Sequence, residues 1–247
     1  MIPNPIRKVL STLFTHKVRA LLMGGQACIL YGAAEFSRDT DVVILADREN
    51  LLKLQAALRE LKAEVIAVPP LDRRYLERGH AVHFRCRHPD VDGIRLDVMS
   101  VLRGLPGFNS LWRRRTTVQL GEDRVEVLSL RDLVHAKKTQ RDKDWPMIRR
   151  LIEADVEAHG AHASEDQMRF WLLESRTPGI LSQLAVRCPE LKNKLIRRRP
   201  LLALLPDASE ADLEEALRDE ERAERERDRR YWEPLRKELE TLRRKKT

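Results

Sequence analysis

The sequence predicts a mixed α/β core followed by a helical C-terminal subdomain. In the first half of the chain, short runs of β-branched and aliphatic residues alternate with segments whose apolar residues recur at helical spacing. From about residue 129 onward the strand patterns stop, and the helical segments that follow are separated by five prolines between residues 146 and 206. We therefore expect residues 1–128 to form the core, residues 129–206 a helical subdomain, and residues 207–247 a charged helical tail.

The individual elements follow from these periodicities. The predicted strands cover residues 20–25, 40–46, 64–70, 80–88, 93–102, 116–120 and 124–129. The predicted helices cover residues 5–18, 26–35, 47–64 and 130–140, and Ser129 with Asp132 resembles an N-terminal cap for the last of these. The turn-forming stretches "PDVDG" (89–93) and "GED" (121–123) predict hairpins between the strands that flank them.

Composition and charge narrow the class of protein. The 247 residues are 42% hydrophobic and 35% charged, with a net charge of +8. This basic balance favours polyanionic partners such as nucleotides or nucleic acid. The three cysteines have no C-x-x-C spacing, which argues against a disulfide framework or a zinc site. No apolar run approaches the roughly 20 residues of a membrane helix, so we expect a cytoplasmic protein without a membrane partner.

Three aspartates stand where a strand would ordinarily carry apolar residues. Asp39 and Asp41 are two residues apart at the start of a predicted strand, so both side chains should project from the same face. In "IRLDVMS", Leu96 and Val98 would face one layer and Asp97 the other. A charge in such a place is costly unless it is matched. Three carboxylates converging from neighbouring strands would form a hard-oxygen site of the kind that Mg²⁺ accepts.

Ordinary structural roles are the alternative for each of these residues. An Asp-x-Asp near a strand start often caps a turn, and the glycine pair that ends "LLMGG" can serve a strand-to-helix turn. Asp97 can pair with an arginine such as Arg95 or Arg85. The order and spacing of all these residues together favour the metal site.

The same residues resemble the nucleotidyltransferase superfamily typified by DNA polymerase β. The superfamily pattern is an apolar residue, Gly, Gly or Ser, about a dozen residues, Asp, any residue, Asp or Glu, and an apolar residue. Met23, Gly24, Gly25, Asp39, Asp41 and Val42 fill those positions in order. Together with "LVHAKKTQRDKDWPMIRRL", the likeness covers roughly residues 19–152 and is similar to minimal nucleotidyltransferases and nucleotidyltransferase-like toxins. Thr40 departs from the pattern, which prefers an apolar residue there.

The resemblance implies a role for each matching residue. Asp39 and Asp41 would be paired ligands of Mg²⁺, or of Mn²⁺ in its place, and Asp97 would be the third carboxylate that helps to activate the acceptor hydroxyl. The nucleotide-binding set would be Gly24, Gly25, Arg38, Lys138 and Arg141. Backbone amides at the glycine pair would approach the triphosphate, and Lys138 and Arg141, one turn apart on a helix, would reach the same phosphates.

The implied reaction moves a nucleoside monophosphate from a nucleoside triphosphate such as ATP to an acceptor hydroxyl on a macromolecule or a small molecule. Two rivals stay open. One is a toxin–antitoxin component that modifies a tRNA or a protein, which the basic C-terminal region supports. The other is a catalytically silent binding module of the same fold, whose carboxylates make salt bridges. No pattern indicates an oligomeric state, and no serine-hydrolase elbow or P-loop is present.

Overall fold

In the computed structural model of the chain, residues 4–121 and 123–246 are described, without the side chain of Lys246. The described residues form two compact units. The first unit contains the residues up to Ala136 together with those from Arg230 onward, and the second contains Lys137–Arg229. These boundaries differ from the sequence-based division at residues 128 and 206, because the end of the last helix belongs to the first unit.

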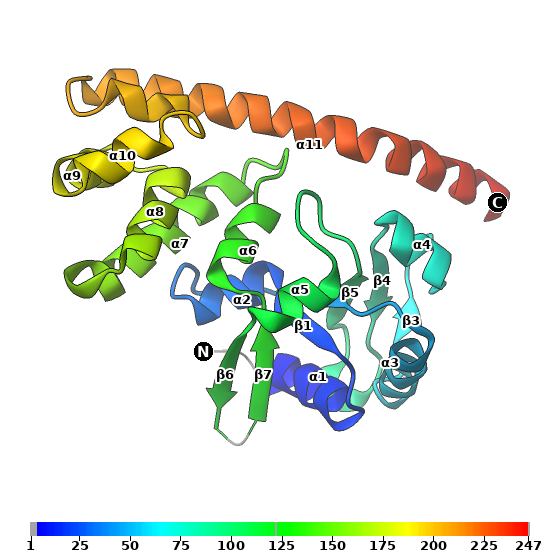
Figure 1. Cartoon of the computed structure of the whole chain (residues 1–247). Helices are drawn as coiled ribbons and strands as arrows, with labels where there is room; N and C mark the ends of the chain where they lie inside the picture. Colours follow the sequence, from blue (N-terminus) through cyan, green and yellow to red (C-terminus); the bar gives the residue numbers. More distant parts are fainter. Residues whose placement is uncertain (1–3, 122, 247) are drawn as a thin grey trace. The chain divides into compact units, whose positions relative to one another are not determined.

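The described residues of the first unit contain a seven-stranded mixed sheet (Figure 1). Its strand order is β3-β4-β5-β2-β1-β7-β6. The pairs β1–β7 and β2–β5 are parallel and the other pairs are antiparallel. The strands are β1 (Ala20–Met23), β2 (Asp39–Ile44), β3 (Glu64–Val65), β4 (Val82–Arg85), β5 (Arg95–Met99), β6 (Thr116–Leu120) and β7 (Asp123–Val127). The predicted mixed sheet is confirmed.

Helices of the first unit connect the strands, and most begin where the sequence predicts. They are α1 (Asn4–Thr15), α2 (Gly24–Leu30), α3 (Arg48–Glu60), α4 (Arg73–Arg78), α5 (Phe108–Arg113) and α6 (Leu130–Ala136), with a short 3₁₀ turn at Pro89–Val91. The Asp47 side chain caps α3 by accepting from the Asn50 amide at 2.7 Å. Ser129 and Asp132 bond reciprocally at the start of α6, as predicted. The sequence analysis missed α4 and α5, which have one to two turns each.

The second unit is helical throughout its described length. It contains α7 (Asp144–His159), α8 (Glu165–Glu174), α9 (Pro178–Arg187), α10 (Pro189–Leu195), 3₁₀ turns at Gly160–His162 and Pro200–Leu204, and the first part of α11 (Glu210–Lys246). Pro178, Pro189 and Pro200 are first residues of their helices, where a missing N–H costs nothing. The predicted helical C-terminal region is confirmed.

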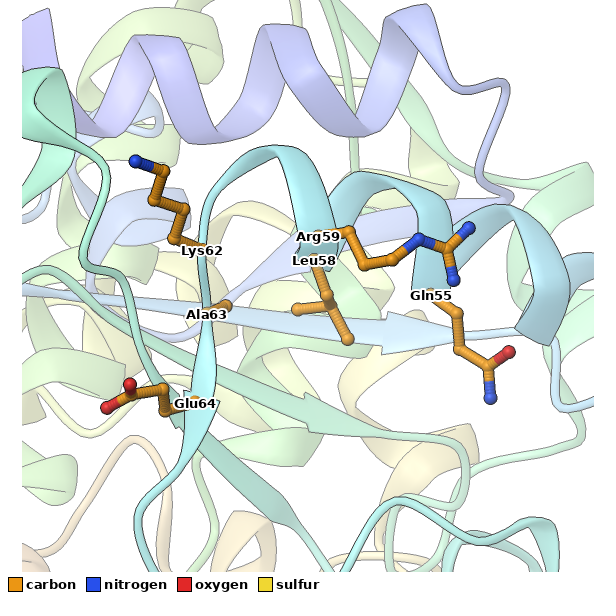
Figure 2. A pocket seen from close by; sticks show the side chains of 6 residues that line it. All are labelled: Gln55, Leu58, Arg59, Lys62, Ala63 and Glu64. Carbon is orange, nitrogen blue, oxygen red and sulfur yellow. The ribbon is translucent and has the colours of Figure 1, made fainter.

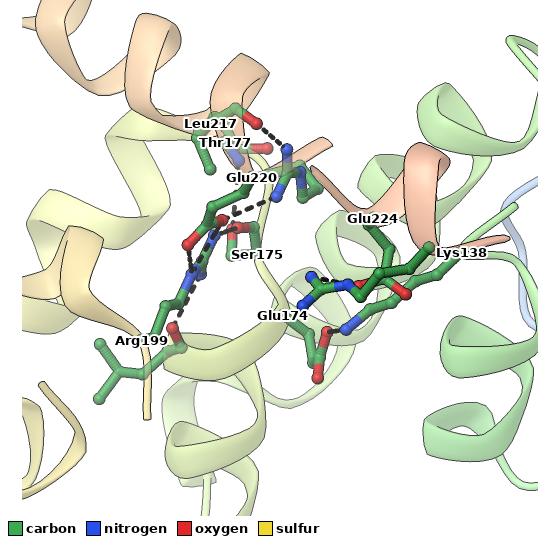
Figure 3. Close-up of polar contacts among 11 residues, drawn as sticks. Lys138, Glu174, Ser175, Thr177, Arg199, Leu217, Glu220 and Glu224 are labelled. Atoms are coloured by element: carbon green, nitrogen blue, oxygen red, sulfur yellow. Dashed lines mark hydrogen bonds and ion pairs between the residues drawn. The ribbon is translucent and has the colours of Figure 1, made fainter. Parts of the chain in front are cut away.

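One buried ion-pair network ties α11 to its neighbours in the second unit (Figure 3). Arg199 is 5% exposed and donates to the carbonyl oxygens of Leu172 and Ser175, both at 2.9 Å, and to Glu220 at 2.8 Å. Arg176 donates to the same carboxylate at 2.9 Å. Burial, and then the charge of Arg199, lower the pKa of Arg176. We call Arg176, Arg199 and Glu220 the arginine–glutamate cluster.

Most predicted elements are shorter in the structure, among them a strand and a helix of the first unit. The strand predicted at 64–70 is reduced to Glu64–Val65, because Pro69 and Pro70 have no N–H to offer the neighbouring strand. The helix predicted at 130–140 ends at Ala136. There, the amide of Gln140 donates to the buried carboxylate of Asp228 at 2.8 Å instead of continuing a helical ladder. Glu122, in the predicted "GED" turn, lies outside the described residues.

Candidate active site

The three predicted carboxylates lie on one face of the sheet. Asp39 and Asp41 are both in β2, and Asp97 is in the neighbouring parallel strand β5. The register pairs Asp41 with Asp97 directly, so their Cα atoms are neighbours at a strand spacing of about 4.8 Å. Thr40, between the two aspartates, is fully buried on the opposite face. We call Asp39, Asp41 and Asp97 the carboxylate face.

The glycine pair at the start of α2 has a steric function that the structure makes plain. A Cβ atom on Gly24 would come within 3.0 Å of the Asp41 carboxylate, and Gly24 has a φ of +67°. A Cβ atom on Gly25 would likewise come within 3.0 Å of the Ser37 hydroxyl. Only glycine allows both approaches, so this pair holds the loop before β2 and the Asp41 side chain against the start of α2.

The Asp97 side chain is 14% exposed and has two partners. His83, opposite it on β4, lies with Nδ1 2.8 Å from Asp97 Oδ1, and the Arg95 Nε donates to the same oxygen at 2.8 Å. Burial raises the pKa of Asp97, but the hydrogen bonds and charges of His83 and Arg95 outweigh it and hold that pKa below its usual range. Asp97 is therefore held as an anion.

Charged side chains of both signs lie in two neighbouring rows on this face. The row next to the one formed by Asp41, Asp97 and His83 contains Asp39, Arg95 and Arg85, in that register. The hydrogen bond that Arg95 donates to Asp97 is the largest cause that raises the pKa of Arg95, and the charges of Asp97, Asp39 and Asp41 raise that pKa further. The Asp39 side chain makes no hydrogen bond or ion pair within the described residues. Three carboxylates and the Arg95 guanidinium thus share one face of the sheet.

Donor chemistry and register decide whether these residues fit a divalent ion. Carboxylate oxygens are the ligands that Mg²⁺ prefers, and the backbone brings three of them to adjacent positions. In the described side-chain positions Asp41 lies against Gly24, and Asp97 lies against Arg95 and His83. No group of three or more His, Cys, Asp or Glu side chains in the described part of the chain stands close enough to share an ion. The ligand atoms and the strand register therefore suit a divalent ion. To share that ion, the Asp97 side chain would have to turn away from Arg95.

The basic residues predicted to bind the nucleotide have different surroundings. Arg38 is exposed at the end of the loop before β2, with its guanidinium 5.7 Å from the centre of the Phe36 ring. Lys138 pairs with Glu174 at 2.6 Å (Figure 3), and Arg141 pairs with Asp144 at 2.7 Å. Both lie after the end of α6 in a loop, so the expectation that they are one turn apart on a helix is wrong. Their role in phosphate binding stays a prediction.

Two residues of the site were missed by the sequence analysis. His83 contacts Asp97, and Ser37 packs against Gly25. The predicted hairpin already implied that β4 pairs with β5. Because side chains alternate between the two faces of a strand, counting back from the hairpin turn in steps of two residues would have placed His83 on the polar face. No local signal points to Ser37, because its contact depends on how the loop before β2 returns to α2.

A hollow of about 440 Å³ lies elsewhere in the first unit, between the end of α3 and β3 (Figure 2). Gln55, Leu58, Arg59, Lys62, Ala63 and Glu64 line it. Four of these side chains are exposed, and none belongs to the carboxylate face.

No helix in the described chain has the length and apolar character needed to cross a membrane.

Comparisons with known proteins leave the family open. No protein-family model matches the chain, and no curated protein matches it significantly. The chain is similar to a solved structure from H. pylori that is provisionally assigned as a nucleotidyltransferase, with a TM-score of 0.42, 13% identity, and coverage of 92% of this chain and 94% of that chain. It is also similar to an antigenic nucleotidyltransferase-like protein from Paracoccidioides brasiliensis, with a TM-score of 0.40, 18% identity, and coverage of 87% and 90%. At these TM-scores the folds agree only loosely, so the function proposed below rests on this chain's own residues.

Proposed function

We propose that the protein is a Mg²⁺-dependent nucleotidyltransferase. It would transfer a nucleoside monophosphate from a nucleoside triphosphate to an acceptor hydroxyl and release pyrophosphate. The observation that carries this proposal is the register of Asp41 beside Asp97, with Asp39 on the same face and Gly24 leaving space for the Asp41 carboxylate. A bound divalent ion would neutralise the phosphates and stabilise the charge that develops on them.

The chain's own residues would bind and position the reactants. Asp39 and Asp41 would hold the ion, and Asp97 would accept the proton of the acceptor hydroxyl as its oxygen attacks the α-phosphorus. Arg38, exposed beside the face, would hold phosphate oxygens, as would backbone amides at Gly24 and Gly25. No covalent intermediate is needed, since catalysis comes from charge neutralisation and positioning.

The acceptor hydroxyl would belong to a macromolecule, such as a tRNA or a protein, or to a small molecule. The net charge of +8 favours a polyanionic acceptor, so tRNA is the first to screen. Binding of tRNA that weakens steeply with rising salt would support this acceptor class.

Calorimetric titration of the four nucleoside triphosphates, with and without Mg²⁺, tests the proposal. We expect Mg²⁺-dependent binding by the wild type and its loss in Asp39→Ala and Asp41→Ala. Asp92→Ala is the matched control, because Asp92 is exposed and its closest ion-pair contact is 3.9 Å away. Full binding and transfer by the Asp41→Ala variant would reject the assignment.

A catalytically silent binding module of the same fold is the second candidate. The pairing of Asp97 with Arg95 and His83 favours it, because these partners already satisfy one of the three carboxylates. This function predicts no Mg²⁺-dependent binding of any triphosphate by the wild type. It also predicts that Asp97→Ala, which leaves Arg95 unpaired, destabilises the fold.

A further inference from the structure

An exposed aromatic ring stands at the rim of the carboxylate face. Phe36 is 63% exposed, in the loop between α2 and β2, three residues before Asp39. The chain between their Cα atoms can span at most about 11 Å. A ring this exposed contributes little to packing in the protein itself.

Two contacts made by the residue after Phe36 anchor the loop that carries the ring. The buried Gln26 donates its Nε2 to the Ser37 carbonyl oxygen at 2.8 Å, and the Ser37 side chain packs on Gly25. Since Ser37 is turned toward α2, its neighbours Phe36 and Arg38 are left at the surface. These contacts position the backbone beside Phe36, while its ring stays exposed.

Arg38 accompanies the ring and completes a recognition pair. Its guanidinium lies 5.7 Å from the Phe36 ring centre and makes no ion pair within the described residues. An aromatic face with an adjacent unpaired cation is the combination that binds a base by stacking and a phosphate by charge.

We propose that Phe36 stacks on the nucleobase of the nucleoside triphosphate while Arg38 contacts its phosphates. This inference rests on the proposed function, because it takes the carboxylate face as the site of the phosphates. Stacking uses the π-face that every base has, so the pair accepts all four bases, with purines preferred for their larger face. Selection between bases of one size would then be weak.

Titration of ATP, GTP, CTP, UTP and inorganic tripolyphosphate in Mg²⁺ tests the pair. In Phe36→Leu, which keeps an apolar side chain without the ring, we expect nucleotide affinity to fall by between about fivefold and about 150-fold. Tripolyphosphate affinity should stay unchanged. Phe36→Trp should restore nucleotide binding.

Phe14→Leu is the matched control, because Phe14 is 55% exposed on α1 and belongs to the same unit. It should bind every ligand as the wild type does. Unchanged nucleotide affinity in Phe36→Leu would overturn the inference while leaving the proposed function intact. An equal loss of tripolyphosphate binding would also overturn it. A wild type that binds neither nucleotides nor tripolyphosphate would overturn both proposals.

Discussion

The carboxylate face of the first unit and the arginine–glutamate cluster of the second differ in how their charges are paired. In the cluster, the Arg199 guanidinium donates to two carbonyl oxygens and to a carboxylate that Arg176 shares. On the face, three carboxylates lie on neighbouring strands, and the Asp39 side chain makes no ion pair in the described chain. Charges that are matched inside the protein stabilise its fold, whereas carboxylates grouped on one face repel one another and favour the binding of a cation.

The largest effect that this comparison predicts is the loss of activity in Asp41→Asn. Removing one negative charge from the face should reduce transfer by at least about 10³-fold, because the ion supplies several kcal/mol of transition-state stabilisation. The free energy of unfolding in metal-free buffer should be unchanged or slightly higher, since carboxylate repulsion is relieved. Transfer assays and urea unfolding measure the two quantities. Strong destabilisation would make Asp41 a structural residue like Glu220.

The second effect is a loss of stability in Glu220→Gln. Two enclosed guanidinium groups would lose their carboxylate, and we expect the free energy of unfolding to fall by about 2–3 kcal/mol. We expect a smaller loss of stability than for a fully buried ion pair, because the Glu220 side chain is 29% exposed. Glu215→Gln, at an exposed position of the same helix, should change stability by less than about 0.5 kcal/mol. Equal urea midpoints for the two variants would contradict the structural role of the cluster.

A third, smaller effect is the loss of stability when a glycine is replaced. The comparison distinguishes a loss caused by backbone strain from one caused by steric contact at the carboxylate face. Gly24 and Gly93 both have positive φ values, of +67° and +78°, but nothing lies within 4 Å of a Cβ atom on Gly93. Gly93→Ala should cost about 1 kcal/mol, and Gly24→Ala should cost more because its methyl group meets Asp41. In an Asp41→Ala background the cost of Gly24→Ala should fall but stay above that of Gly93→Ala, because the Cβ atom that alanine keeps at position 41 still lies 2.8 Å from the added methyl group. A thermal unfolding series with this double mutant tests it.

The smallest effect concerns how the free energy of unfolding depends on pH in the acid range. Asp144 is 1% exposed; burial raises its pKa, but the charge of Lys137, the Thr139 hydrogen bond and the charge of Arg141 bring that pKa below its ordinary value of 3.8. A carboxyl with a depressed folded-state pKa contributes stability above the unfolded value and loses it as pH falls through the folded value. The stability difference between wild type and Asp144→Asn should therefore be constant above about pH 5 and shrink below pH 3.8.

Urea midpoints between pH 2 and pH 6 measure this dependence. Asp207→Asn is the control, because Asp207 is exposed, and its profile should follow the wild type. A difference that does not change across this range would mean that the Asp144 carboxyl has the same pKa in the folded and unfolded states, contrary to its lowered pKa in the folded protein.

Local patterns in the sequence determined the elements around the site. Periodicity of two placed Asp39 and Asp41 on one face of β2, and the buried Leu96 and Val98 placed Asp97 on the polar face of β5. These assignments need only neighbouring residues, because side-chain direction in a strand repeats every second position. The mixed sheet, the change to helices near residue 129 and the capped start of α6 follow from equally local signals.

Tertiary structure alone decided which of these elements meet. The register that sets Asp41 beside Asp97, the approach of Asp41 to Gly24 and the contact of His83 with Asp97 all join residues distant in sequence. The Gln140 amide donates to Asp228, which lies 88 residues away in the sequence. Periodicity shows which way a side chain points, but which strand or carboxylate stands opposite is settled by packing of the whole unit.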